Sequence, residues 1–316
     1  MRLQKIRMLS LVEASLVTFL WSSSYVLIRI GLEEINPIAF AAYRYILASL
    51  MLLLPFYLQF RKGKSMRFNL KRIGLLLVLG FTGFFIAQGF QFIGLFFLNS
   101  VTVTFILNLT PLFVLGLSVF LLNEWPTNRQ VIGIIMTLVG VIIFFFDAIA
   151  DFGTSIGVLI TLISGLGWAF YIVISRRYLV KDNESVITLT SISMLFGAFM
   201  LLGATGLTGN LVNVSFNGWM IILWLSVVNT AVAFFLWNHA LKTLKAIEQS
   251  ILQNSMLIQI SLLAFFFLQE EISEYNILGM TIVFTGVLVV QLSNNRRKKK
   301  PQKNSTENNS IKQLSE

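Results

Sequence analysis

Apolar residues follow one another along the chain in ten long runs separated by short polar connections. Each run is roughly 18 to 25 residues long, and a bilayer core about 30 Å thick needs about 20 helical residues to cross it. Barrel strands would alternate polar and apolar residues, so unbroken runs predict transmembrane helices. The runs cover residues of about 9–30, 37–58, 73–94, 99–122, 130–147, 155–175, 186–206, 218–240, 247–268 and 275–292.

One segment occurs twice. FLLNEWPTNRQVIGIIMTLVGVIIFF at 120–145 and FLQEEISEYNILGMTIVFTGVLVVQ at 267–291 share a Leu-polar-Glu start and an apolar stretch with Gly-x₆-Gly. Self-similarity at a fixed spacing indicates an internal repeat. The predicted domains are therefore a first five-helix repeat at 9–147 and a second at 155–292. The pairs 146 residues apart are Glu124 and Glu270, Gly133 and Gly279, Gly140 and Gly286, and Asn108 and Asn254, while Trp21 and Trp168 are 147 apart.

Five helices per repeat is an odd number, so the second copy must enter the membrane from the opposite side. The charges agree, because 22 of the 24 Lys and Arg residues fall in the termini and in alternate connections. Positive charge is retained on the cytoplasmic side. The fold class predicted is an all-α integral membrane protein, with ten helices in two inverted-topology repeats and both termini in the cytoplasm.

Composition agrees with a multi-pass protein of the cytoplasmic membrane: 56% of residues are hydrophobic and 12% are charged, and the mean hydropathy is +0.79. The net charge of +10 is read as a topology signal and not as a nucleic-acid site. Residues 1–8 are expected to be a cytoplasmic N-terminus, and 293–316 a disordered basic cytoplasmic tail. RRKKK at 296–300 is a candidate contact to anionic lipid.

Three stretches carry a resemblance. LWSSSYVLIRIGLEEINPIAFAAYRYILASLMLLLP (20–55), LNSVTVTFILNLTPLFVLGLSVFLLNEWPTNRQVIGIIMTLVGVII (98–143) and FFLWNHALKTLKAIEQSIL (234–252) resemble the EamA-type family of the drug/metabolite transporter superfamily. The resemblance implies two five-helix repeats and the export or exchange of small metabolites, typically amino acids. Where the first copy has Pro111, the second has Leu257. Proline can kink helix 4, whereas helix 9 lacks that cause, so the halves are expected to bend unequally.

Polar and aromatic residues near the midplane are the candidate substrate cavity. Trp21 and Trp168 occupy the same position in the two repeats, so pseudo-symmetry would bring them around one space, although core packing is the alternative. Amides there can bind substrate or equally join helices. The candidate cavity residues are Trp21, Ser24, Tyr25, Arg44, Gln88, Gln91, Asn108, Trp168, Tyr171, Asn229 and Asn254.

Arg44 lies about seven residues into helix 2, which at 1.5 Å per residue is roughly 10 Å below its outer end. A guanidinium at that depth must face the bundle and find an acceptor. It can contact an anionic group of the substrate, or it can be a structural tie to helix 1 carbonyls or to Glu33 or Glu34. Both interpretations stay open.

Protons are a candidate coupling ion, with Glu13 and His239 as candidate carriers. Glu13 can instead snorkel or pair with Lys242 or Lys245, and His239 can have a packing or interfacial role. The single histidine and the absence of cysteine exclude a metal site of the usual kind, and no cofactor is expected.

Other charges are interpreted as architecture. Arg29 is expected to be a snorkelling anchor and Glu248 a charge at the start of helix 9. Glu124 and Glu270 fall on opposite faces of the membrane, so they cannot form one site. Each is expected near the N–H groups that open a helix, with the glycine pairs allowing close helix packing.

The function predicted is a secondary transporter that moves a small polar metabolite by alternating access. The simplest test of this function is the substitution Arg44→Ala. An ATP-driven pump is disfavoured because the chain has no G-x₄-G-K-[ST]. An enzyme is not expected, because it would need a nucleophile with a base, paired acids or a metal cluster, whereas the chain has one isolated His, no Cys and scattered acids. The alternatives kept are a membrane-embedded scaffold or receptor, and an exporter of hydrophobic drug-like compounds. Expected partners are the substrate and membrane lipids, with a monomer or a homodimer as the assembly.

Overall fold

The computed structural model describes residues 2–61, 69–144, 155–180, 185–208, 213–268 and 273–296. Over these ranges the secondary structure is helical. Eight helices are long and apolar enough to cross a membrane, and the apolar helices at Asn128–Ile143 and Ile277–Gly286 are shorter. The ten predicted runs therefore all correspond to helices, of which eight have the length of a full span.

The first half of the chain forms the elements α1 to α7. Asn36 starts the second of them, because its side-chain oxygen accepts hydrogen bonds from the backbone N–H groups of Ile38 and Ala39, as an N-cap does. The bounds are α1 (Arg2–Gly31), α2 (Pro37–Arg61), α3 (Leu70–Gly80), η1 (Phe81–Gly89), α4 (Phe90–Phe97), α5 (Ser100–Leu107), α6 (Thr110–Leu122) and α7 (Asn128–Phe144).

The second half forms α8 to α14. α14 continues to Arg296, past residue 293, where the sequence predicted a disordered tail; residues 297–316 lie outside the described residues. The bounds are α8 (Ser155–Val180), α9 (Val186–Leu207), α10 (Phe216–Ser226), η3 (Val227–Val232), α11 (Ala233–Leu241), α12 (Ala246–Gln253), α13 (Met256–Leu268) and α14 (Glu274–Arg296).

Both halves contain a π-helical segment at the same place. η1 begins at Phe81 and η3 at Val227, which are 146 residues apart like the sequence pairs. A π-helical turn leaves backbone groups open to other partners and is frequent at functional sites. The Ala87 carbonyl of η1 accepts a hydrogen bond from Ser164 of α8 at 2.6 Å. A backbone group of the π-helical segment in the first half therefore bonds to a side chain of the second half.

Both halves also contain a broken helix. The fourth span breaks between α5 and α6 at Asn108 and Leu109, and the ninth breaks between α12 and α13 at Asn254 and Ser255. The ninth span therefore breaks without a proline, since Leu257 stands where the first repeat has Pro111, and the expected unequal bending of the halves stays a prediction. In the ninth span Ser255 N–H bonds to Leu252 in a tighter three-residue turn, in a segment whose polar side chains compete for backbone groups.

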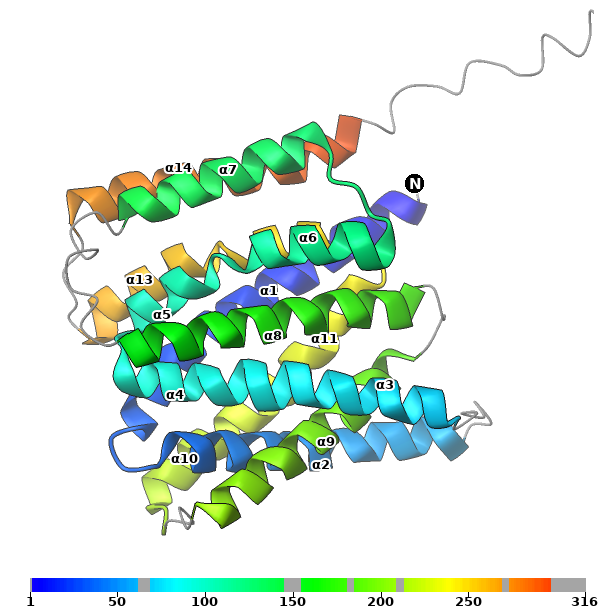
Figure 1. The fold of residues 1–316 in the computed structure, drawn as a ribbon, viewed down its shortest axis with the longest axis vertical. Helices are drawn as coiled ribbons and strands as arrows, with labels where there is room; N and C mark the ends of the chain where they lie inside the picture. The colour runs from blue at the N-terminus through cyan, green and yellow to red at the C-terminus, as the bar shows by residue number, and fades with distance from the viewer. Residues whose placement is uncertain are drawn as a thin grey trace, which may run out of the picture.

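The repeated glycines join α7 to α14, which lie side by side along one edge of the bundle (Figure 1). A Cβ atom added at Gly140 would lie 2.7 Å from the carbonyl oxygen of Gly279, and one at Gly286 would lie 2.9 Å from that of Gly133. The two contacts are reciprocal. The prediction that these glycines permit close helix packing is confirmed.

Glu124 and Arg29 have partners that the sequence did not indicate. Glu124 accepts a hydrogen bond from Arg176 at 3.3 Å and so joins the α6–α7 connection to α8, rather than binding the N–H groups that open α7. Arg29 donates to the backbone oxygen of Leu95 at 2.8 Å, which satisfies a carbonyl at the end of α4, so it is more than a snorkelling anchor. Glu270 lies outside the described residues.

Candidate functional site

A cavity lies between the two halves of the bundle. It leaves about 40 Å³ for the centres of water-sized molecules, and a single water needs about 10 to 15 Å³ on that measure. The space therefore suits a few waters and would have to widen for a metabolite. Its walls are Trp21, Ser24, Tyr25, Arg44, Ala87, Gln88, Gln91, Thr104, Leu107, Asn108, Ser164, Trp168, Gln253, Asn254 and Met256.

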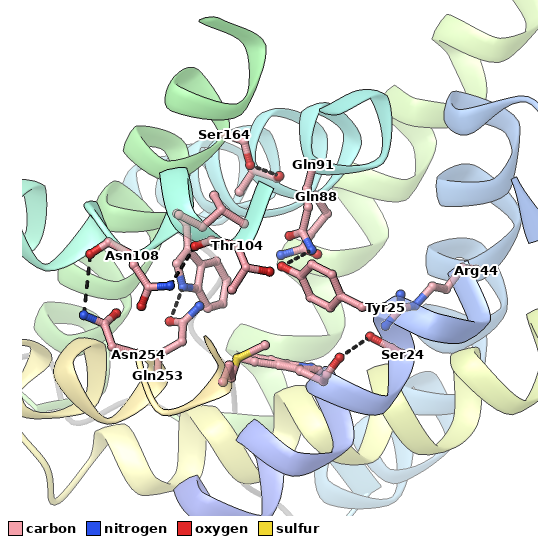
Figure 2. A pocket seen from close by; sticks show the side chains of 15 residues that line it. Ser24, Tyr25, Arg44, Gln88, Gln91, Thr104, Asn108, Ser164, Gln253 and Asn254 are labelled. Carbon is pink, nitrogen blue, oxygen red and sulfur yellow. Dashed lines mark hydrogen bonds between the residues drawn. The ribbon is translucent and has the colours of Figure 1, made fainter. Parts of the chain in front are cut away.

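Nine of the eleven residues predicted for the cavity line it, as Figure 2 shows for most of them. The two others, Tyr171 and Asn229, lie just behind the wall. The Tyr171 ring stacks on Trp168 with centroids 5.0 Å apart, and its hydroxyl accepts a hydrogen bond from Asn238 at 2.7 Å. The side-chain amide of Asn229 donates to the Leu20 oxygen and to Ser23, so it joins α1 to η3.

The two repeated tryptophans meet in the cavity wall. The Trp21 and Trp168 rings make an edge-to-face contact with centroids 5.6 Å apart, a favoured geometry for aromatic pairs. Trp21 donates its indole N–H to the backbone oxygen of Asn229 at 3.1 Å, and Trp168 donates to the side-chain oxygen of Gln253 at 2.7 Å. Both buried indoles are therefore satisfied and held in fixed orientations.

An aromatic layer supports these rings from α11. Trp237 lies 4.9 Å from Trp21, and Phe234 lies 5.1 Å from Trp21 and 5.9 Å from Trp168, between ring centroids. Neither supporting ring is more than 1% exposed. The cavity thus has one rigid aromatic side, against which a flat or apolar part of a ligand can pack.

Arg44 is held by the second half of the chain. Its Nε donates to the Thr230 hydroxyl at 2.6 Å and its Nη2 to the backbone oxygen of Asn229 at 3.2 Å. Neither predicted structural partner, the carbonyls of helix 1 or Glu33 and Glu34, accepts from it. The π-helical segment η3 explains the difference, since it presents the Asn229 carbonyl to both Arg44 and Trp21.

Two glutamines of the third span are positioned by tyrosines. Tyr45 donates its hydroxyl to Gln88 at 2.7 Å, and Gln91 donates to the Tyr25 hydroxyl at 3.0 Å. Gln88 lies in η1 and Gln91 in α4, three positions apart and thus on one face. Each amide keeps donor or acceptor positions that can serve a ligand.

The two helix breaks meet at the other side of the cavity. The side-chain amide of Asn254 donates to the backbone oxygen of Asn108 at 3.5 Å, and the Asn108 amide donates to Thr104 at 2.7 Å. The Asn108 side-chain oxygen is buried without a hydrogen-bond partner among the described residues. This side of the cavity therefore presents an unused acceptor.

Six wall residues were not among the predicted ones: Ala87, Thr104, Leu107, Ser164, Gln253 and Met256. Sequence signals existed for three of them. Thr104 shares a helix face with Asn108, Ser164 precedes Trp168 by one turn, and Gln253 is the neighbour of Asn254. The remaining three are apolar, and nothing in their spacing separates a cavity wall from ordinary core.

Glu13 and His239, the two candidate proton carriers, are partners of each other. His239 Nδ1 lies 2.8 Å and 3.0 Å from the two carboxylate oxygens of Glu13. The expected pairing of Glu13 with Lys242 or Lys245 is therefore wrong. The side chains are 13% exposed for Glu13 and 45% for His239, so the pair lies between the core and the end of the bundle where α1 begins.

More polar contacts join the two halves at this end of the bundle, here called the α1 end. Glu248 accepts from Arg7 at 3.2 Å and from Gln130 at 3.4 Å. It also accepts from the backbone N–H of Lys245 at 3.3 Å, which confirms its expected place at the start of helix 9. Arg176, which binds Glu124, donates to the Leu241 and Lys242 oxygens at the end of α11.

The opposite end of the bundle has a different character. Among the described residues, the ion pairs of Arg7 with Glu248 and of Arg176 with Glu124 and the contact of His239 with Glu13 all lie at the α1 end. The halves meet at the opposite end through an exposed hydrogen bond of 2.9 Å from Ser215 to Glu34. Charged ties between the halves therefore concentrate at one end.

Comparison with known proteins identifies the family. The EamA-like transporter family model matches residues 8–146 and matches again at residues 155–292. The chain belongs to the EamA-like transporter family. EamA membership together with the apolar helices makes it a multi-pass membrane protein, and the names of its relatives indicate a transporter rather than an enzyme.

Relatives match along almost the whole chain. An uncharacterized transporter of Archaeoglobus fulgidus is 25% identical over 280 residues, which is 86% of this chain and 94% of the relative. The uncharacterized transporter YyaM of Bacillus subtilis is 27% identical over 261 residues, 80% of this chain and 84% of its own. A protein of known crystal structure shares the EamA-type fold with a TM-score of 0.72 and 19% identity, covering 90% of this chain and 99% of its own.

Proposed function

We propose that this EamA-family member is a secondary transporter of a small polar metabolite, an amino acid or a related compound, which it exports across the cytoplasmic membrane by alternating access. One observation carries the proposal. Residues from both halves of the chain build a single cavity with an aromatic side, several amides and one arginine. Transporters place their sites at the interface of repeats near the midplane, among interrupted helices.

The backbone irregularities support movement around that cavity. A π-helical segment and a helix break occur at corresponding positions in each half. Such places have fewer regular backbone bonds to disrupt and are natural points of bending. Bending at both breaks would change the outline of the cavity without unfolding a whole helix.

The proposed topology of ten membrane crossings, two opposed repeats and cytoplasmic termini gives the two ends of the bundle their roles. The α1 end becomes the cytoplasmic end, and its ion pairs become the contacts that must separate when the cavity opens inward. The weaker contact between Ser215 and Glu34 becomes the external closure. Alternation is then an exchange between these two sets of contacts.

Protons are the proposed coupling ion, with the Glu13–His239 pair as their site. The pair joins α1 to α11 across the halves, so a change of its charge acts directly on closure of the α1 end.

A toxicity screen tests the transport function. Cells overexpressing the protein are grown with amino acids, their analogues and other metabolites, beside cells expressing Arg44→Ala at the same membrane level. The proposal expects at least one compound whose toxicity falls with the native chain and not with the variant. If no compound changes growth or accumulation, the export function is wrong.

A further inference from the structure

Each half of the chain contains an arginine that binds the end of another helix of the same half. Arg29 of α1 donates from Nη1 to the backbone oxygen of Leu95 in α4 at 2.8 Å. Arg176 of α8 donates from Nη1 to the backbone oxygen of Leu241 in α11 at 2.6 Å. The arginines are 147 residues apart, as the repeated tryptophans are, and the leucines are 146 apart. One contact is therefore made twice, once in each repeat.

Each arginine satisfies the end of a helix that shapes the cavity. The last carbonyls of a helix have no partner within it, and a cation near them also interacts favourably with the helix dipole. Leu95 lies in the last turn of α4, and Leu241 is the last residue of α11. These helices continue directly from η1 and η3. Because η1 carries Gln88 of the cavity wall and η3 binds Arg44, the two contacts fix the far ends of both cavity helices.

The two contacts lie at opposite ends of the bundle. Arg176 belongs to the α1 end, where it also binds Glu124 at 3.3 Å. Arg29 lies in the last turn of α1 and so belongs to the other end, here called the α4 end. In Figure 1 the α1 end is on the right, beside the mark N, and α4 ends on the left. Each arginine therefore holds one cavity helix at a different end.

The two ends are not held equally. Arg176 is 9% exposed and has three acceptors, which are two backbone oxygens at the end of α11 and the carboxylate of Glu124. Arg29 is exposed, donates to one backbone oxygen, and has no acidic partner among the described residues. Contacts of exposed charges are weakened by solvent. The end of α11 is therefore held more firmly than the end of α4.

The cavity lies beside the more weakly held end. Gln88 and Gln91 line it, and the residues 146 positions later are Phe234 and Trp237. These two rings are at most 1% exposed and pack against Trp21. Gln91 and Trp237 each lie one turn before the carbonyl that the arginine of their half binds. The space next to the contact of the first half is therefore open, and the matching space in the second half is filled by rings.

We propose that Arg29 and Arg176 are positioning residues of the transport cycle, each of which keeps the cavity closed towards its own end of the bundle. Loss of Arg29 releases α4 and opens the cavity at the α4 end, whereas loss of Arg176 releases α11 and opens the α1 end. The inference rests on the proposed alternating access and goes beyond it by assigning one residue to each orientation. Repeats of opposite orientation place equivalent contacts at opposite faces of the membrane, so equivalent substitutions act in opposite directions.

The experiment measures access to the cavity from each side of the membrane in the full-length chain. The sequence has no cysteine, so Ser24→Cys in the cavity wall supplies a single thiol. A membrane-impermeant maleimide is added to intact cells and to inverted vesicles, and the two labelling rates are compared. Asn213→Cys, which is exposed at the α4 end, shows which preparation presents that end. Methionine replaces each arginine in turn, because it keeps an unbranched stem without a donor.

Arg29→Met should raise the labelling rate from the α4 side and leave the rate from the α1 side unchanged. Arg176→Met should do the reverse. The expected increase is about tenfold, which corresponds to the loss of one hydrogen bond from a charged donor. Arg29→Lys and Arg176→Lys keep a charged donor and should restore most of the native rates. If both methionine variants speed labelling from the same side, or neither changes it, the inference is overturned.

Exposed charges beside the two arginines provide matched controls. Arg177→Gln lies next to Arg176, and Glu33→Gln lies one turn beyond Arg29, and both should be labelled as the native chain is. Arg29→Met guards against misfolding of Arg176→Met, because it removes one contact of an exposed side chain. Folded and inserted Arg29→Met that is labelled faster from the α1 side, from both sides equally, or from neither side would contradict the proposal.

The inference and the transport function fail separately, because labelling needs no substrate. If the methionine variants act on opposite sides but the growth screen finds no exported compound, the positioning role stands and the transport function is wrong. If a compound is exported and the two variants act on the same side, transport stands and the positioning role is wrong.

Discussion

Asn254 donates its side-chain amide to the backbone oxygen of Asn108 at 3.5 Å, and these two asparagines occupy the same position in the two repeats. Each lies where its helix breaks, between α5 and α6 or between α12 and α13. The contact is one-sided, because the Asn108 amide turns back to Thr104. The two halves are therefore similar in backbone but differ in the hydrogen bonds at their meeting point.

Asn254→Ala should loosen this meeting point. The Asn108 carbonyl would lose its donor, and an interhelical hydrogen bond of this kind is worth about 0.6 kcal/mol. We expect a small loss of stability in detergent unfolding but a large loss of substrate movement, because the bending point changes. Asn217→Ala, at an exposed position of α10, is the matched control. Equal effects of the two substitutions would remove the Asn254 contact from the mechanism.

Trp168→Phe should remove a hydrogen bond from the cavity wall while an aromatic ring stays in place. The ring remains, but Gln253 loses the indole N–H that donates to it at 2.7 Å. Loss of a hydrogen bond to a partly buried group such as this costs about 0.5–1.5 kcal/mol. We expect weaker substrate binding with normal membrane insertion, measured by fluorescence titration and membrane yield. The control is Trp125→Phe, whose tryptophan is 71% exposed and whose binding should stay native.

Gly140→Leu should separate α7 from α14. The new side chain would collide with the backbone of Gly279 and Val283, and overpacking of this kind costs about 1–3 kcal/mol or more. Gly116→Leu introduces the same side chain where nothing lies within 4 Å of the Cβ position. The thermal unfolding midpoint should fall for the first variant and change little for the second. A similar midpoint in both would show that the glycines do not set the packing.

Closure of the α1 end should depend on the charge of Glu13. Its carboxylate oxygens lie 2.8 Å and 3.0 Å from Nδ1 of His239, and this contact joins α1 to α11 across the two halves. A substitution that removes the charge should therefore weaken closure of the α1 end and change the transport rate.

Glu13→Gln tests this dependence. The variant can keep a hydrogen bond to His239 but carries no charge, so its transport rate, measured beside the native chain under the same conditions, should differ from the native rate. Glu33→Gln, on the exposed turn after α1, is the control and should transport as the native chain does. A transport rate that Glu13→Gln leaves unchanged would exclude the pair from closure of the α1 end.

The fold and the content of the cavity follow largely from periodic features of the sequence. The apolar runs predicted every described helix, and the repeated glycines predicted close helix packing, which Gly140 and Gly286 provide between α7 and α14. Nine predicted residues line the cavity because repeated positions and helix faces are local properties that a linear pattern contains.

Partners and backbone irregularities could not be predicted in the same way. η1 (FTGFFIAQG) and η3 (VVNTAV) have no common residue pattern, so their shared position reflects tertiary packing. Glu13 contacts His239, and Arg44 donates to the Asn229 carbonyl. Both contacts depend on which helices are neighbours in the fold, and the sequence does not state that. The break in the ninth span could not be predicted from a proline, because Leu257 stands where the first repeat has Pro111.

The absence of cysteine from the sequence makes closure of the α1 end directly measurable. Ser24 lines the cavity, so Ser24→Cys gives a single thiol whose reaction with a membrane-impermeant maleimide reports access from each side. With the charged contacts of the α1 end intact, labelling from the α1 side should be slow. Glu124→Gln removes the charge that binds Arg176 at 3.3 Å and should speed labelling from that side.

A surface thiol calibrates the comparison. Asn213→Cys lies at the opposite end, in the connection before α10, is exposed, and should react at the same rate whether or not Glu124 is replaced. If Glu124→Gln speeds both thiols equally, the protein has simply loosened. If it leaves Ser24→Cys unchanged, the Glu124–Arg176 pair does not hold the α1 end closed. Faster labelling of Ser24→Cys from the α1 side alone would mean that these ion pairs set the balance between the two orientations of the cavity.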